Sequence, residues 1–323
     1  MKVFEMKSFL SLAMLLLAST ASAQTAVDPG LPVYPRVEGI KGNVVMVGSY
    51  TMSQLGAVWG DSFQKLYPDV QIKIDPKGSK DAVSSVIHGE SSFGLLSRSI
   101  TEAEVKAFHD KFGYLPTVVT PALEPIAIYV HKDNPIDSLS LAQLDGIFSK
   151  TLKRGAPRTA STWGDLGAAG KYASIPVSCE VRNDETGSQV FFQAAILGNG
   201  EFRDGMHNHV SNLELVKAVA ANPGAIGFGG ATFATPDVKV IALKWRDEDP
   251  AMTIHQATYP LVRPLQVVIN RPPQKQLRDI EREFLKFVFS QKGQQDVILG
   301  GFVPVQARAA QIALDAMDLR TLN

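Results

Sequence analysis

Three short segments of the sequence combine glycine with small hydroxyl residues where a helix is expected to begin. They are residues 48–51 (GSYT), 78–79 (GS) and 182–188 (RNDETGS). The first turn of a helix has unpaired N–H groups and a partial positive charge, and glycine lets a ligand approach the backbone closely. The segments therefore predict donors for an anion, although a Ser or Thr in any one of them is also typical of an ordinary helix cap.

Two arginines accompany these segments. Arg182 opens the third segment, and Arg98 follows Ser97 after a short apolar run at residues 93–96. The end of such a strand is where open α/β sheets hold ligands, and a guanidinium offers charge and forked donors that suit a tetrahedral oxyanion. Together these elements favour an oxyanion site, with a surface or ion-pairing role as the alternative for Arg98.

The overall composition limits what kind of protein can carry such a site. The chain has 323 residues, of which 45% are hydrophobic, and its 32 Lys+Arg balance 32 Asp+Glu. This composition is typical of a globular protein and argues against a nucleic-acid binder, which usually concentrates basic residues. At this length a single hydrophobic core usually gives way to two domains.

The N-terminus has the pattern of a secretory signal peptide. Lys2 and Lys7 precede an apolar run at residues 9–18, and residues 21–23 form an A-x-A end. The run is too short for a membrane span, so we expect residues 1–23 to be removed and the mature protein to be periplasmic. The single Cys179 cannot form an internal disulfide and is expected to be a small buried hydrophobic residue.

Short apolar strands alternate with amphipathic helices along most of the chain, which predicts an α/β fold. Two extended passages marked by prolines, residues 116–125 and 255–264, are placed to carry the chain between two lobes. They predict a discontinuous lobe I, residues 24–118 and 256–323, and a continuous lobe II, residues 119–255. Further expected elements are strands at 44–47, 70–74, 93–96, 126–130 and 265–269, and helices that begin after Ser49, Thr101 and Ser140.

The chain as a whole resembles the periplasmic phosphate-binding proteins of phosphate ABC importers, in the broader phosphate-binding-protein-like family. The resemblance is carried by GSYT, GSKDAVSSVIHGE, FGLLSRSI, IAIYVHKDNP with SLAQLDGIF, RNDETGSQVFF, PGAIGFGG and YPLVRPL. It implies two α/β lobes, each a mixed sheet flanked by helices, joined by two hinge strands with the anion between them. It also implies delivery of phosphate to an ABC-transporter permease by a monomer without cofactor or metal.

The same resemblance assigns phosphate contacts to particular positions. Where the family has Ser-Gly-Thr after its Arg, the two hydroxyl residues are exchanged here. Many members have an Asp where Ser97 stands, and that carboxylate accepts a hydrogen bond from protonated phosphate and repels sulfate. Sulfate, molybdate and organic phosphate therefore stay open as ligands, and Tyr50 replaces a smaller hydroxyl residue. The implied contacts are Ser49, Tyr50, Thr51, Gly78, Ser79, Ser97 with Arg98 next in line, Arg182, Thr186, Gly187 and Ser188.

An enzyme is the main alternative to a binding protein. A secreted phosphatase on the same scaffold would pair a Ser or Thr at a helix start with one of the six histidines. The sequence contains no G-x-S-x-G or H-E-x-x-H motif, and His207 and His209 have no cysteine nearby and no evident paired carboxylate with which to bind a metal. We therefore expect a binding protein with no catalytic residues. A secreted structural or interaction protein is the third possibility.

Overall fold

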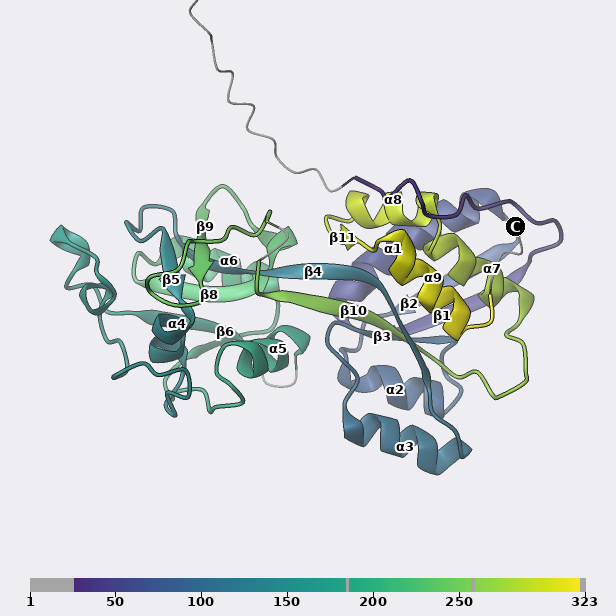
Figure 1. Cartoon of the computed structure of the whole chain (residues 1–323), viewed down its shortest axis with the longest axis horizontal. Coiled ribbons are helices and arrows are strands. Elements are labelled where there is room, and N and C mark those ends of the chain that lie inside the picture. Colours follow the sequence, from purple (N-terminus) through teal and green to yellow (C-terminus); the bar gives the residue numbers. More distant parts are fainter. Residues whose placement is uncertain (1–25, 184–185, 257–258, 320–323) are drawn as a thin grey trace, which may run out of the picture.

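The computed structural model describes residues 26–183, 186–256 and 259–319 of the chain. The signal peptide expected at residues 1–23 lies outside the described residues. The described part forms two lobes that are joined by two long antiparallel strands, β4 (Thr117–His131) and β10 (Val262–Ile269) (Figure 1). The two-lobed α/β fold predicted from the sequence is confirmed.

The first lobe contains both ends of the described chain. Its part of the sheet has the order β2-β1-β3-β10-β4, in which β1, β2 and β3 are parallel and β10 is antiparallel to its neighbours. Figure 1 shows α2 and α3 on one side of this sheet and α1, α7, α8 and α9 on the other. The elements are β1 (Gly42–Gly48), α1 (Tyr50–Leu66), β2 (Val70–Asp75), α2 (Lys80–Ile87), β3 (Phe93–Leu96), α3 (Glu102–Phe112), α7 (Asp279–Val288), α8 (Gln291–Leu299), β11 (Val303–Pro304) and α9 (Ala307–Ala316).

The core of the first lobe joins segments from the two ends of the chain. Trp59 and Phe63 lie on one face of α1 because they are spaced by four residues, and both are buried. The ring of Phe63 packs against Phe284 and Phe287 of α7, with ring centroids 5.3 and 5.5 Å apart. Burial of these amphipathic faces holds the N-terminal and C-terminal segments in one lobe.

The second lobe is continuous in sequence. Its part of the sheet continues from β4 through β8 and β6 to β7, and β9 pairs with both β4 and β5. The rings of Phe192 and Phe228 stack with centroids 3.7 Å apart, and Cys179 is buried as expected. The elements are β5 (Ser138–Ser140), α4 (Leu141–Phe148), β6 (Ser178–Arg182), α5 (Gly187–Ala195), β7 (His207–His209), α6 (Asn212–Ala221), β8 (Ala225–Gly230), β9 (Val238–Lys244) and short 3-10 helices at Trp163–Leu166, Gly170–Tyr172 and Ala231–Phe233.

The two strands that connect the lobes pair with each other along the crossing. The main apolar cluster of the first lobe draws on residues 31–122 and 265–319, and that of the second lobe on residues 126–261. The chain passes from one cluster to the other between residues 122 and 126 and again between residues 261 and 265, where β4 and β10 pair. The lobe limits expected at residues 118–119 and 255–256 stay predictions. At the crossing, Glu124 of β4 lies opposite Arg263 of β10 in the register.

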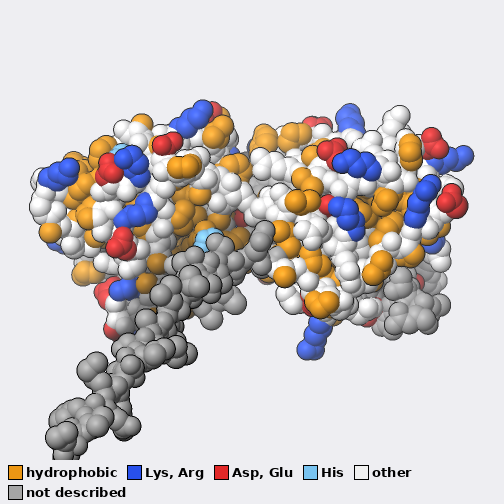
Figure 2. Space-filling model, turned by 90° about the horizontal axis from the view of Figure 1, so that it is seen from above, with side chains coloured by type: hydrophobic (Ala, Val, Ile, Leu, Met, Phe, Trp, Pro, Cys, Tyr) orange, Lys and Arg blue, Asp and Glu red, His pale blue; other side chains and the backbone are white. Residues whose placement is uncertain are grey.

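The surface of the described part has no dominant charge on the face seen in Figure 2. Basic and acidic side chains are interspersed over both lobes, which a narrow waist separates. This mixture agrees with the balanced charge of the sequence. No helix within the described ranges is long and apolar enough to cross a membrane.

Candidate functional site

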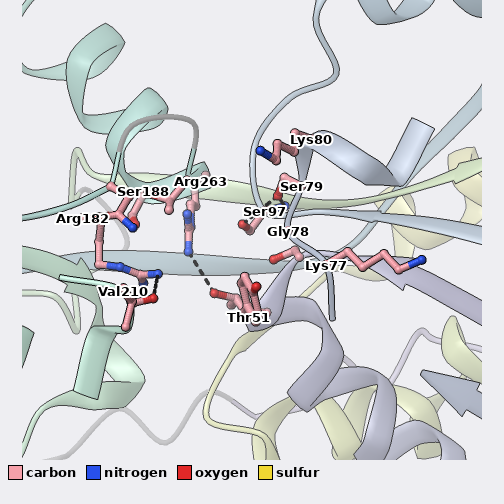
Figure 3. A pocket seen from close by; sticks show the side chains of 15 residues that line it. Thr51, Lys77, Gly78, Ser79, Lys80, Ser97, Arg182, Ser188, Val210 and Arg263 are labelled. Atoms are coloured by element: carbon pink, nitrogen blue, oxygen red, sulfur yellow. Dashed lines mark hydrogen bonds between the residues drawn. The ribbon is translucent and has the colours of Figure 1, made fainter. Parts of the chain in front are cut away.

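A pocket lies at the waist, between the two lobes and beside the hinge strands (Figure 3). Its volume is about 310 Å³. Every contact position implied by the resemblance lines it, except Arg98. The lining residues are Ser49, Tyr50, Thr51, Lys77, Gly78, Ser79, Lys80, Ser97, Arg182, Asn183, Thr186, Gly187, Ser188, Val210 and Arg263.

The wall from the first lobe is built where three strands end. Gly48 ends β1 with a φ of +139°, and a Cβ atom there would lie 2.2 Å from the carbonyl oxygen of Leu95 in β3. This close approach requires glycine. It lets the Ser49 N–H donate to the Leu95 oxygen at 2.8 Å, while the Gly78 N–H donates to the Gly48 oxygen at 2.8 Å. The starts of α1 and α2 are thereby held side by side against the end of β3.

Two hydroxyl groups of this wall contact each other, and a third caps a helix. The Ser49 hydroxyl caps α1 by accepting from the Met52 N–H at 3.3 Å. The Ser79 hydroxyl lies 3.3 Å from the Ser97 hydroxyl and accepts from the Ser97 N–H at 3.2 Å. Tyr50 keeps 56% of its surface exposed at the pocket mouth. The wall thus presents short, buried hydroxyls at its centre and one aromatic side chain at its rim.

The wall from the second lobe consists of the end of β6 and the start of α5. Arg182, the last residue of β6, is only 6% exposed. Its guanidinium donates to the carbonyl oxygens of His209 (3.1 Å) and Val210 (2.8 Å) and to Oδ1 of Asn212 (2.8 Å). All three acceptors are neutral, so these contacts fix the side chain without cancelling its charge. Burial lowers the pKa of Arg182 below its ordinary value, and the neighbouring charge of Arg263 lowers that pKa further.

The start of α5 confirms that a helix begins in this segment. The Thr186 hydroxyl accepts from the Gln189 N–H at 3.4 Å as the N-cap, and α5 begins at Gly187. A Cβ atom on Gly187 would lie 2.3 Å from the Ser97 hydroxyl oxygen of the other lobe. Glycine therefore allows the two walls to approach each other at this point. Residues 184–185 lie outside the described part of the chain.

Arg98 lies outside the pocket and has a different partner. Its guanidinium donates to both carboxylate oxygens of Glu104, at 2.9 and 2.8 Å, and to the Ser99 carbonyl at 3.0 Å. Ser97 and Arg98 both follow the end of β3, and Ser97 lines the pocket while the Arg98 side chain reaches Glu104 in α3. The structure therefore favours the ion-pairing alternative for Arg98. Burial would raise the pKa of Glu104, but hydrogen bonds from Arg98 and Thr101 outweigh it and hold that pKa below its ordinary value.

The main residue that sequence reasoning missed is Arg263. It lies in the YPLVRPL segment that carries the resemblance, but a single cation in an apolar strand pattern was not singled out as a ligand. Its side chain is 1% exposed, and it forms a buried ion pair with Glu124. Lys77, Lys80, Asn183 and Val210 also line the pocket without having been predicted. Lys77 is half exposed and pairs with Asp75 at 3.2 Å.

The charged side chains that line the pocket in the described part of the chain are basic. Of the described residues that line it, four are Lys or Arg, and none is Asp, Glu or His. His209 lies in β7 and contacts Glu180, with 2.8 Å between His Nε2 and the carboxylate. No group of three or more His, Cys, Asp or Glu in the described ranges is placed to hold a metal ion.

A two-lobed α/β molecule with a donor-lined pocket at its hinge has the architecture of a solute-binding protein. A family profile described as a PBP superfamily domain matches residues 19–292. The phosphate-binding protein PstS of Pseudomonas aeruginosa is 38% identical over 304 residues, which cover 93% of this chain and 94% of that protein. The chain therefore belongs to the periplasmic phosphate-binding protein family, within the PBP superfamily.

More distant relatives support the same fold. PstS of Staphylococcus saprophyticus is 28% identical over 263 residues, covering 78% of this chain and 77% of that protein. A phosphate ABC transporter substrate-binding protein from Clostridium perfringens, solved with bound phosphate, has a TM-score of 0.65 at 23% identity and covers 82% of this chain and 100% of that chain. A phosphate transport receptor from Vibrio cholerae has a TM-score of 0.63 at 20% identity with the same coverage.

Proposed function

We propose that this chain is an exported solute-binding protein that captures inorganic phosphate in the interlobe pocket and delivers it to the permease of an ABC importer. The observation that carries the proposal is the convergence of the α1, α2 and α5 starts on one pocket whose charged lining residues, among those described, are all basic. Within the described part of the chain, Arg182 is held there by neutral acceptors. Membership of the phosphate-binding protein family supports phosphate as the ligand.

Capture proceeds in two stages. The anion first meets N–H and hydroxyl donors of the first lobe at Ser49, Thr51 and Ser79, together with Ser97. The second lobe then closes about the hinge and brings Arg182 and the start of α5 onto the anion. Closure removes water, so that charge-assisted hydrogen bonds supply the binding energy.

Residues 1–23 direct export, and the mature chain works as a monomer in the periplasm. Cell fractionation tests this assignment: the full-length chain should yield a shortened protein in the periplasmic fraction, and removal of residues 1–23 should leave it in the cytoplasm. Coupling to a permease is tested by phosphate uptake in cells that carry or lack the gene, with the Arg182→Met variant as a binding-deficient control.

Calorimetric titration of the mature protein tests the ligand. Phosphate should bind, and at one hundred times its dissociation constant it should stabilise the fold by about 2.7 kcal/mol. Sulfate, molybdate and a phosphate ester serve as competitors. Absence of phosphate binding by the folded protein would refute the proposed function.

The phosphatase alternative is tested on the same sample. The described lining residues include no histidine or carboxylate to act as a general base, so we expect no turnover of a chromogenic phosphate ester. Hydrolysis that is lost in Ser79→Ala would instead establish an enzyme.

A further inference from the structure

The ion pair of Arg263 and Glu124 occupies the point where the hinge strands cross between the lobes. The two residues are opposite each other in β10 and β4, and their side chains are 1% and 0% exposed. Nε and Nη2 of Arg263 donate to the same oxygen of Glu124 at 2.8 and 2.5 Å, and Nη2 also donates to the Thr51 hydroxyl at 3.3 Å. One edge of the guanidinium is therefore fixed by the protein.

Among the described residues, the other nitrogen of this guanidinium has no hydrogen-bond partner. Nη1 of Arg263 is buried without a hydrogen bond, and the residue lines the pocket. The ideal Cβ position on Gly187 is 3.1 Å from Nη1, so Nη1 lies next to the start of α5. In Figure 3 the Arg263 side chain lies between Arg182 on one side and Thr51 and Ser97 on the other. A buried, charged donor without an acceptor is costly, and an acceptor in the pocket would remove that cost.

We propose that Arg263 is a second anion-binding guanidinium, which donates from Nη1 to an oxygen of a doubly charged tetrahedral oxyanion, and that Glu124 is the positioning residue that fixes it. The inference rests on the proposed function and adds a ligand to that site. Because Arg263 belongs to the hinge rather than to either lobe, it can contact the anion before and after closure. Glu124 pairs with Arg263 but does not line the pocket, so the anion would meet the guanidinium end of this pair together with Arg182. Such an arrangement favours a double negative charge over a single one.

The test compares phosphate binding by the mature parent with a variant that neutralises both partners. Arg263→Met combined with Glu124→Gln avoids leaving a lone buried charge, which could prevent folding. We expect phosphate to bind about 10- to 100-fold more weakly, as for the loss of a charge-assisted hydrogen bond. The parent's affinity should also rise more steeply than the variant's between about pH 6 and pH 8, where phosphate gains its second charge.

Two further variants separate ligand binding from a structural role. Arg203→Met is the matched control, because Arg203 also donates to backbone carbonyls, of Ala160 and Val177, and does not line the pocket. It should keep the parent's affinity and pH dependence. Arg263→Lys keeps the charge but lacks the forked nitrogens, and we expect binding about 10-fold weaker. Thermal unfolding without phosphate shows that each variant is folded.

The outcomes distinguish this inference from the function on which it rests. If the parent does not bind phosphate, the proposed function fails. If the parent binds and the folded double variant binds equally tightly with the same pH dependence, the role of Arg263 is overturned while the function stands. Should the double variant fail to fold, undiminished affinity in Arg263→Lys overturns the proposal in the same way. A structure with bound phosphate should show Nη1 within hydrogen-bond distance of an oxygen, and a longer separation would contradict it.

Discussion

Arg182 and Arg98 are both buried arginines at strand ends, but their partners give them different roles. The guanidinium of Arg98 meets the carboxylate of Glu104, which neutralises it inside the protein. Among the described residues, the guanidinium of Arg182 donates to carbonyl and amide oxygens, so these contacts leave its charge available to a ligand. Arg98 is turned away from the pocket by its carboxylate partner, whereas Arg263 lines the pocket and keeps Nη1 free of its own carboxylate partner.

Replacement of Arg182 by Met should weaken phosphate binding strongly. The buried anion would lose a counter-charge and its donors, at a cost of about 2–5 kcal/mol, or at least about 30-fold in affinity. Calorimetric titration measures the change, with Arg203→Met as the control. Unaltered affinity in a folded Arg182→Met protein would remove this residue from the site.

Introduction of a carboxylate at Ser97 should sharpen the choice between anions. In Ser97→Asp the new carboxylate can accept a hydrogen bond from protonated phosphate but repels fully ionised sulfate. We expect the ratio of phosphate to sulfate affinity to rise at least about 10-fold. Competition titrations measure the ratio, and Ser97→Asn is the uncharged control. An equal decrease in the affinities for phosphate and for sulfate would contradict the prediction.

The pair of Arg98 and Glu104 should make stability depend on pH. Because the folded-state pKa of Glu104 lies below its ordinary value, the pair stabilises the protein above that value and ceases to do so as pH falls through the folded pKa. Urea unfolding should therefore show the parent more stable than Glu104→Gln at neutral pH. The difference should shrink as the pH drops below about 4.5. If the difference in stability between the parent and Glu104→Gln does not change with pH, the carboxylate charge is not what stabilises the protein.

At the residue scale, the sequence indicated which hydroxyl residues line the pocket better than which charged residues do, and donation to a ligand stays a prediction. Ser and Thr beside Gly at a helix start have local spacing that can be read directly, and all of those predicted positions line the pocket. The roles of Arg98 and Arg263 depend on partners in other elements. Glu104 reaches Arg98 from the next helix, whereas Glu124 lies 139 residues before Arg263. No local pattern marks that second partnership.

Among the secondary-structure elements, the positions of the helix starts depend on close packing at the ends of the strands. The starts of α1 and α2 meet at Gly48, where backbone from β3 leaves no room for a side chain. The position of this pocket wall therefore depends on the strand order β2-β1-β3 as well as on the hydroxyl residues.

Replacement of Gly48 by Ala should destabilise the protein and displace this wall. The added Cβ would overlap the Leu95 oxygen at a positive φ, and we expect a loss of about 3 kcal/mol or more in the free energy of unfolding. Gly113→Ala is the matched control, because Gly113 also has a positive φ (+77°) but no atom within 4 Å of the added Cβ. It should lose only about 1–2 kcal/mol. Equal losses in urea unfolding would show that crowding at Gly48 is unimportant.

The elements themselves were largely predictable. Capping boxes at Thr101 with Glu104 and at Ser140 with Gln143 are present as predicted, because a cap depends only on neighbours in sequence. The continuity of β4 was not: the sequence predicted an extended passage at 116–125 and a separate strand at 126–130, and the two form one strand that begins at Thr117. Two prolines interrupt the pattern in its first part, and pairing with β10 and β11 maintains the strand through it.

For the whole molecule, binding should be accompanied by closure of the lobes. Of the described elements, β4 and β10 run between the two lobes in Figure 1, and the anion is proposed to contact donors from both lobes. The radius of gyration from small-angle scattering should therefore fall when phosphate is added. Arg182→Met should show a smaller decrease at the same phosphate concentration. An unchanged radius in phosphate-saturated parent protein would mean that the lobes are already closed.

The composition of the first lobe also determines the order in which an exported chain can be completed. Phe63 and Phe284 share one core, and Asp28 accepts a hydrogen bond from the Ala307 N–H. Residues near the start of the described chain therefore cannot complete their contacts until the C-terminal segments have been exported. All segments of the second lobe are available earlier, because that lobe is continuous in sequence. During translocation the later half of the binding site can therefore be assembled first, and the half that begins the sequence is finished last.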